Sequence, residues 1–157
     1  MLFRKIACGL VLCWILGAAD TAADWVRQGQ AYKAKGDAPA ALQAFEKALS
    51  LDPKSSQIED EIGFILAATN RRDEAIAHFQ KAIQLDPRFA PAHYHLGVAY
   101  WLGQDPNRSI PELEAAVKLR PTDADYRYRL GSAYNSVGQH PQAARELSEA
   151  IKQQYWL

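Results

Sequence analysis

The sequence predicts an all-α fold, a right-handed superhelical solenoid of four stacked helix pairs. The first observation is that the phrase Leu51-Asp52-Pro53 returns as Leu-Asp-Pro at 85–87 and as Leu-Arg-Pro at 119–121, at one constant interval. The second is that a glycine and a late alanine recur at the same interval. They are Gly29, Gly63, Gly97 and Gly131, and Ala48, Ala82, Ala116 and Ala150. Consecutive units therefore cover 22–55, 56–89, 90–123 and 124–157.

The third observation is the helical spacing of large and small residues inside each unit. In the first unit one set is Trp25, Gln28, Gly29 and Tyr32, and the other is Ala41, Phe45, Ala48 and Leu49. Gly36-Asp37 separates the two sets, and Pro53 ends the second because proline cannot continue a helix. Each unit is thus expected to be two antiparallel helices of about 13 residues joined by a short turn.

The recurring small residues have a packing reason. A glycine where two helices cross lets their backbones approach closely, and large neighbours fill the space beside the crossing. One helix pair cannot bury its apolar stripe alone, whereas stacked pairs cover one another and form a concave and a convex face.

The ordered pattern of aromatic, Leu-Gly, Tyr, Ala, aromatic, Ala and Pro resembles the tetratricopeptide repeat. The first unit carries it as Trp25, Gly29, Tyr32, Ala41, Phe45, Ala48 and Pro53. The resemblance covers residues 22–157 in four units without insertion. It implies a scaffold that binds other proteins through a concave groove lined by the first helix of each pair.

Two units depart from this pattern. In the third unit Pro111 follows Pro106, so either Asn107 or Ser109 caps a helix that starts late, or the helix kinks. The fourth unit has Tyr155 in place of the proline and no polar helix after it. Leu147, Ile151, Tyr155 and Trp156 either form an apolar C-terminal interface, open to self-association, or are covered by the tail.

The N-terminal segment, 1–19, has the order of a secretory signal peptide. Arg4 and Lys5 precede an apolar run from 6 to 16, and small residues follow at 17–19. Cleavage is expected after Ala19, with Ala23 as the alternative, which makes the protein periplasmic or secreted. The other alternative is an uncleaved membrane anchor, although the run is shorter than the roughly 20 residues a spanning helix needs.

Composition excludes several classes of function. Basic and acidic residues both number 18, so no net positive charge favours nucleic acid. Cys8 and Cys13 both lie in the N-terminal segment, which leaves the processed chain without a disulfide or a cysteine nucleophile. No catalytic motif or phosphate-binding loop is present, so we expect neither an enzyme, a cofactor nor a small-molecule substrate.

The histidines and the acidic run receive structural interpretations. His93 and His95 are two residues apart and face different ways on a helix, so no metal site is expected. The run at 59–61 is interpreted as a solvated first helical turn, favoured by the helix dipole.

Candidate groove residues lie beside the packing stripe of each first helix, at the fifth, ninth and twelfth places of the unit. They are Lys33, Phe64, Tyr94, Val98, Trp101, Tyr128 and Asn135. The aromatic and apolar members are suited to anchor a partner, whereas Lys33 and Asn135 suit its polar groups. The alternative is that Tyr94 and Trp101 belong to the interhelical core.

The sequence therefore predicts a protein–protein interaction scaffold that binds a segment or helix of a partner outside the cytoplasm. The alternative is a structural or assembly subunit of a cell-envelope complex, such as pilus, secretion or exopolysaccharide machinery, that contacts partners through its C-terminal end.

Overall fold

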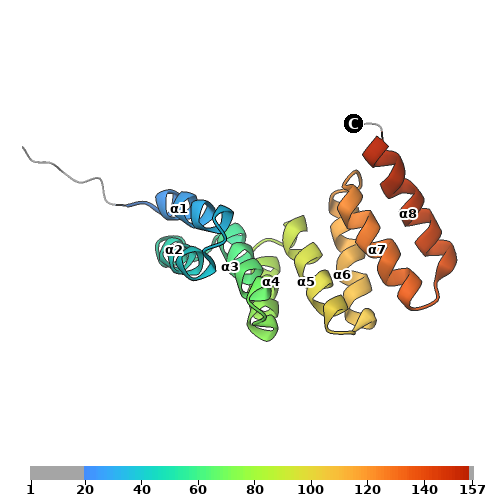
Figure 1. Ribbon diagram of the computed structural model, residues 1–157, viewed down its shortest axis with the longest axis horizontal. Helices are drawn as coiled ribbons and strands as arrows, with labels where there is room; N and C mark the ends of the chain where they lie inside the picture. Colours follow the sequence, from blue (N-terminus) through green and yellow to red (C-terminus); the bar gives the residue numbers. More distant parts are fainter. Residues whose placement is uncertain (1–19, 156–157) are drawn as a thin grey trace, which may run out of the picture.

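A computed structural model describes residues 20–155, which form helices and turns without a strand (Figure 1). The helices are α1 (Ala22–Ala34), α2 (Ala38–Leu51), α3 (Ser56–Ala68), α4 (Arg72–Leu85), α5 (Ala90–Leu102), α6 (Pro106–Leu119), α7 (Ala124–Ser136) and α8 (His140–Tyr155). The all-α solenoid is confirmed, with one helix pair in each unit. The signal-peptide segment 1–19 and Trp156 lie outside the described residues.

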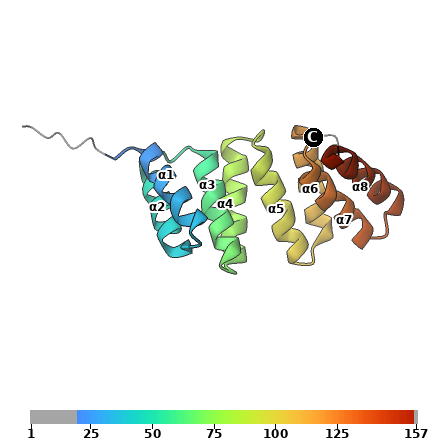
Figure 2. The ribbon, with the colours of Figure 1, turned by 45° about the horizontal axis from the view of Figure 1, so that its top comes forward.

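The helices are stacked in sequence order, so neighbours along the chain are neighbours in space (Figures 1 and 2). Each first helix packs against its own second helix and against the second helix of the preceding unit. In addition α3 contacts α5 and α5 contacts α7, whereas the second helices make no comparable contact within the described chain. The stack is therefore tighter along the first helices, which line its concave side.

The glycines lie at helix crossings, as the sequence predicted. A Cβ atom on Gly63 would come within 2.6 Å of the Phe79 ring, and one on Gly97 within 2.7 Å of Leu113 Cγ. Gly29 faces Phe45 and Gly131 faces Leu147 in the same way. Only a residue without a side chain permits this approach, which explains why glycine recurs at the same place in every unit.

The core runs through the whole stack instead of forming one centre. Its fully buried large side chains come from the second helices at Phe45, Phe79 and Leu113 and from the first helices at Ile62 and Leu96. Each of them lies between successive helices, so every unit supplies cover for its neighbour.

Helix α6 corrects one sequence expectation. It starts at Pro106 and continues through Pro111 to Leu119, so neither Asn107 nor Ser109 is its cap. The cap is Asp105, whose side chain accepts a hydrogen bond from the Arg108 backbone N–H at 3.2 Å. Pro106 is tolerated at the first helical position because no backbone N–H is needed there, whereas Pro111 lies inside the helix.

A polar residue is buried inside the third pair. The Ser109 hydroxyl donates a hydrogen bond to the Gly97 carbonyl oxygen at 2.8 Å, across the crossing of α5 and α6. The equivalent positions in the other units are the alanines 41, 75 and 143. The small hydroxyl therefore fits where only a methyl group otherwise does.

The acidic run at the start of α3 corrects a second expectation. Glu59 and Asp60 are only 7% and 5% exposed, so they do not form a solvated turn. Glu59 contacts His78 Nδ1 of α4 at 2.7 Å, and Asp60 contacts His95 Nδ1 of α5 at 2.8 Å. Burial of these carboxylates is possible because each has a hydrogen-bonding partner on a neighbouring helix.

The Glu59–His78 contact belongs to a recurring link between the two helices of a unit. The equivalent pairs are His93–Glu112 at 2.7 Å and Arg127–Glu146 at 2.5 Å. In each pair the partners are 19 residues apart, whereas the first unit has Trp25 and Ala44 there. In units 2 to 4 a polar pair at the same two positions therefore links the two helices, although the residue types differ from unit to unit.

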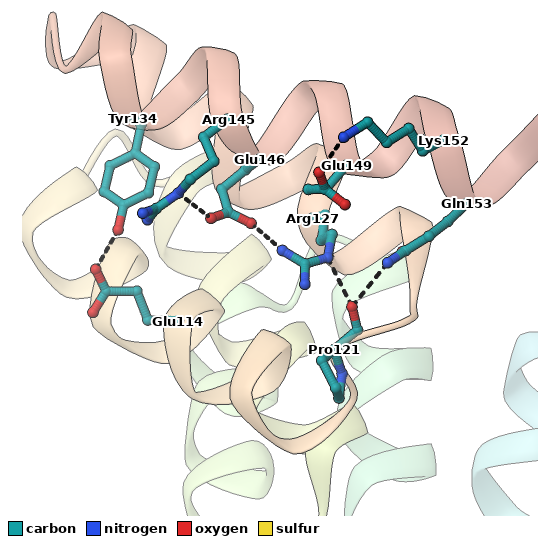
Figure 3. Close-up of polar contacts among 9 residues, drawn as sticks. All are labelled: Glu114, Pro121, Arg127, Tyr134, Arg145, Glu146, Glu149, Lys152 and Gln153. Carbon is teal, nitrogen blue, oxygen red and sulfur yellow. Dashed lines mark hydrogen bonds and ion pairs between the residues drawn. The ribbon is translucent and has the colours of Figure 1, made fainter.

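A group of polar contacts surrounds α7 and α8 (Figure 3). Arg127 Nε and Gln153 Nε2 both donate to the Pro121 carbonyl oxygen, at 2.7 and 3.0 Å. The Tyr134 hydroxyl donates to Glu114 of the preceding unit. Burial, followed by this hydrogen bond, raises the pKa of Tyr134 to about 12.

Among residues 20–155 no helix combines the length and the apolar character that crossing a membrane requires.

Candidate interaction groove

A continuous furrow crosses the first helices on the concave side. It consists of three adjoining hollows, of about 250 Å³ between α1 and α3, 310 Å³ between α3 and α5, and 460 Å³ where the ends of α5 and α7 meet the start of α6. Phe64 and Ala68 line both the first and the second hollow, and Leu102 lines both the second and the third. These shared walls join the hollows, and we call the whole the furrow.

The central hollow is the most apolar part of the furrow. Phe64, Ala68, Val98 and Leu102 contribute to its walls. Phe64 is 41% exposed and Leu102 is 56% exposed, an unusual degree for such large apolar side chains. A hollow of this kind suits a bulky apolar side chain of a partner.

Tyr94, Val98 and Trp101 serve the core as well as the furrow. All three are half-buried and pack against the core cluster around Leu113 and Leu130. Tyr94 and Val98 also line the central hollow, and Trp101 lines the hollow beside α7. Tyr94 and Trp101 therefore line the furrow and also contact the core, so each of the two sequence alternatives describes part of their position.

The polar candidates already have partners within the chain. Lys33 Nζ lies 2.6 Å from the Glu61 carboxylate and 5.1 Å from the centre of the Phe64 ring. Asn135 is exposed, and its side-chain oxygen lies 3.1 Å from His140 Nδ1. Tyr128 is exposed on α7. Lys33 thus joins α1 to α3, and Asn135 joins α7 to α8.

Two of the C-terminal candidates, Leu147 and Ile151, differ in their surroundings. Leu147 packs into the crossing at Gly131, within the last helix pair. Ile151 is 56% exposed on α8. Tyr155 ends α8, and Trp156 lies outside the described residues.

Sequence reasoning missed Leu102, which lines the furrow, and Arg129, which lies over the ring of the furrow residue Trp101. Leu102 is at the thirteenth place of its unit and Arg129 at the sixth, one residue beyond the places considered. The guanidinium carbon of Arg129 lies 5.6 Å from the centre of the Trp101 ring. Their signal was helical spacing, because Leu102 lies four residues after Val98 and Arg129 three residues before Ser132, the ninth place of its unit, and such residues share one face of a helix.

The described histidines contact carboxylates or the Asn135 amide instead of converging on one point. No group of three or more metal-ligating side chains is found between residues 20 and 155.

Comparison with protein families decides the assignment. Profiles described as "Tetratricopeptide repeat" match residues 22–55 and 103–156, and one described as "TPR repeat" matches residues 63–103. Together they span most of the chain that the structure describes. The chain belongs to the tetratricopeptide-repeat family. No curated protein matches it significantly.

Many solved structures share the fold of this tetratricopeptide-repeat chain. A crystal structure of MamA superposes with a TM-score of 0.78 at 22% identity, over 88% of this chain and 81% of MamA. A second MamA crystal structure is 28% identical, with a TM-score of 0.74 over 85% of this chain and 73% of the other. YrrB, described as a TPR protein with an unusual peptide-binding site, gives 0.73 at 22% identity, over 84% and 68%.

Proposed function

We propose that the protein is a protein-interaction scaffold whose furrow binds a segment or helix of a partner. The observation that carries this proposal is the exposure of Phe64 and Leu102 beside the apolar central hollow. Large apolar side chains exposed together on a concave surface are typical of a binding site. The fold shared with YrrB, whose description names a peptide-binding site, supports the same proposal.

We further propose that the scaffold works outside the cytoplasm after removal of residues 1–19. The signal-peptide order of that segment supports export. The start of α1 favours cleavage after Ala19 over Ala23, because Thr21 and Asp24 form a capping box. Thr21 Oγ1 accepts from the Asp24 N–H at 3.2 Å, and cleavage after Ala23 would remove this cap. Sequencing the N-terminus of the purified protein should find Asp20; an intact Met1 would contradict export by cleavage.

The test of the furrow combines Phe64→Ala with Leu102→Ala and measures partner recovery from a cell-envelope extract. Both side chains are partly exposed, so the substitutions should lower the thermal midpoint only modestly, and the midpoint is measured to confirm that the variant is folded. The account expects recovery of the specific partner to fall roughly tenfold, as loss of binding anchors does. Leu51→Ala, at the end of α2, is the matched control because Leu51 is also exposed but lies outside the furrow. Equal recovery by all three proteins would overturn the proposal.

The second candidate function is that of an assembly subunit that associates through α8. Ile151 is the observation that favours it, because it is a large apolar residue exposed on that helix. Light scattering over a range of concentrations should then show association that Ile151→Ser abolishes. A monomer at every concentration would remove this candidate and leave the furrow untouched.

A further inference from the structure

At two of the three junctions between units, a polar side chain of one first helix contacts a partner on the preceding first helix. At the first junction between units, Lys33 of α1 pairs with Glu61 of α3 at 2.6 Å. At the second, Asp60 of α3 pairs with His95 of α5 at 2.8 Å. Glu61 and His95 both occupy the sixth place of their units. At both junctions a sixth-place side chain therefore contacts a polar partner on the preceding first helix.

Arg129 occupies the sixth place of the fourth unit, and at this junction the matching carboxylate is missing. The preceding helix, α5, presents Trp101, whose ring centre lies 5.6 Å from the guanidinium carbon. Within residues 20–155 no carboxylate oxygen lies within 4.0 Å of the Arg129 guanidinium. Asp125, one turn earlier on α7, is exposed and forms no ion pair with it. Arg129 is thus a half-buried cation on α7, held over the ring of Trp101, which itself lines the furrow.

We infer that the furrow selects a partner segment with a bulky apolar residue for the central hollow and a carboxylate for Arg129. This inference rests on the proposed function and names the chemistry of the partner. Charge complementarity supports it, because Lys33 and Asp60 have polar partners within the chain, whereas Arg129 has no carboxylate within 4.0 Å among the described residues. Leu102 connects the two sites, since it lines both the central hollow and the hollow beside α7.

The arrangement around Arg129 also explains how a carboxylate would be recognised. The planar guanidinium presents several N–H donors, which suit a carboxylate better than a single ammonium group does. The Trp101 ring holds the cation in place, so less side-chain freedom is lost on binding. Trp101 itself is fixed by its packing against the core cluster of the third and fourth units.

The experiment selects peptides from a random library displayed on phage, with the purified protein as the target. Three proteins are compared, which are the wild type, Arg129→Gln, and Arg145→Gln as control. Arg145 is an exposed arginine on α8, outside the furrow, so its loss removes the same formal charge from a different surface.

The inference expects wild-type peptides to combine a bulky apolar residue with Asp or Glu at a constant spacing. Selection on Arg129→Gln should keep the apolar residue and lose the acidic preference, whereas Arg145→Gln should behave as wild type. A synthetic peptide from the wild-type selection should bind Arg129→Gln roughly fivefold more weakly, the scale of a partly exposed ion pair. Its affinity should also become less sensitive to salt.

Two results would overturn the inference. One is a set of enriched peptides without an acidic preference, and the other is an acidic preference that survives Arg129→Gln. In both cases, if Phe64→Ala still weakens the peptides, the proposed furrow function stands without this partner chemistry. Enriched peptides that bind Phe64→Ala, Leu102→Ala and Arg129→Gln as they bind the wild type would overturn the inference and the proposed function together.

Discussion

Each crossing glycine in this protein faces a particular large side chain of the following helix. Gly29 and Gly63 face phenylalanines, whereas Gly97 and Gly131 face leucines. The constant period of the repeat made this role predictable, because a glycine inside a helix needs a packing reason to recur. The identity of the facing side chain followed from the same period.

Gly63→Ala tests this packing directly. Alanine favours a helix by about 1 kcal/mol over glycine, so propensity alone predicts a gain in stability. The new Cβ would lie 2.6 Å from the Phe79 ring, and we expect a net loss of about 1–3 kcal/mol from overpacking. Chemical unfolding measures the difference, and Ala67→Gly, at an exposed position of α3, measures the propensity term alone. A more stable Gly63→Ala protein would contradict the crossing.

The pKa of Tyr134 gives a prediction on pH. Because burial and the bond to Glu114 raise this pKa to about 12, the folded protein favours the neutral phenol. Its contribution to stability is complete below pH 10 and is lost as the pH rises from about 10 to 12. Unfolding by denaturant at pH 9 and pH 11 should show a smaller alkaline loss for Tyr134→Phe than for the wild type. Tyr128→Phe, at an exposed position, is the control, and an identical alkaline loss in all three proteins would refute the assignment.

At the scale of the helix, the sequence predicted the number, type and order of the elements. It failed at the start of α6, because three neighbouring residues, Asp105, Asn107 and Ser109, are each suited to cap a helix. It failed at Glu59 and Asp60 because their histidine partners lie on other helices. A signal for the polar links existed, since the partners within each unit are always 19 residues apart.

The Arg127–Glu146 pair between α7 and α8 can be tested by replacing it with the residues that the first unit has at the same places. Arg127→Trp alone leaves the buried Glu146 without its main cation and should cost about 3 kcal/mol. Adding Glu146→Ala recreates the residues of the first unit, Trp25 and Ala44, and should restore most of that loss. Chemical unfolding of the two variants measures the recovery. A double variant as unstable as the single one would show that the polar link is not an independent module.

On the scale of the whole molecule, the helices follow one another along the stack (Figure 2), and α3–α5 and α5–α7 make additional contacts. The sequence predicted this stack and its concave face, because four units in register leave little choice of architecture. It predicted the furrow only partly. Phe64 and Tyr128 proved exposed, whereas Lys33 and Asn135 were found engaged by Glu61 and His140, which depends on side-chain geometry between helices.

A stack of this kind should be least stable at its ends. Helices α3 to α6 are covered on both sides, whereas α1 and α8 are covered on one side within the described chain. Amide hydrogen exchange should therefore be slowest in α3 to α6 and fastest in α1 and α8. Uniform protection across all the units would contradict a stack held by nearest-neighbour contacts.

The central claim is that the concave furrow is the surface that binds a partner. A photo-crosslinking amino acid placed at Phe64, in the furrow, or at Lys118, exposed on α6, tests it most directly in living cells. We predict a specific crosslinked product from position 64 that is lost in the Leu102→Ala background, and none from position 118. The same partner crosslinked equally from both positions, or from position 118 alone, would contradict the account.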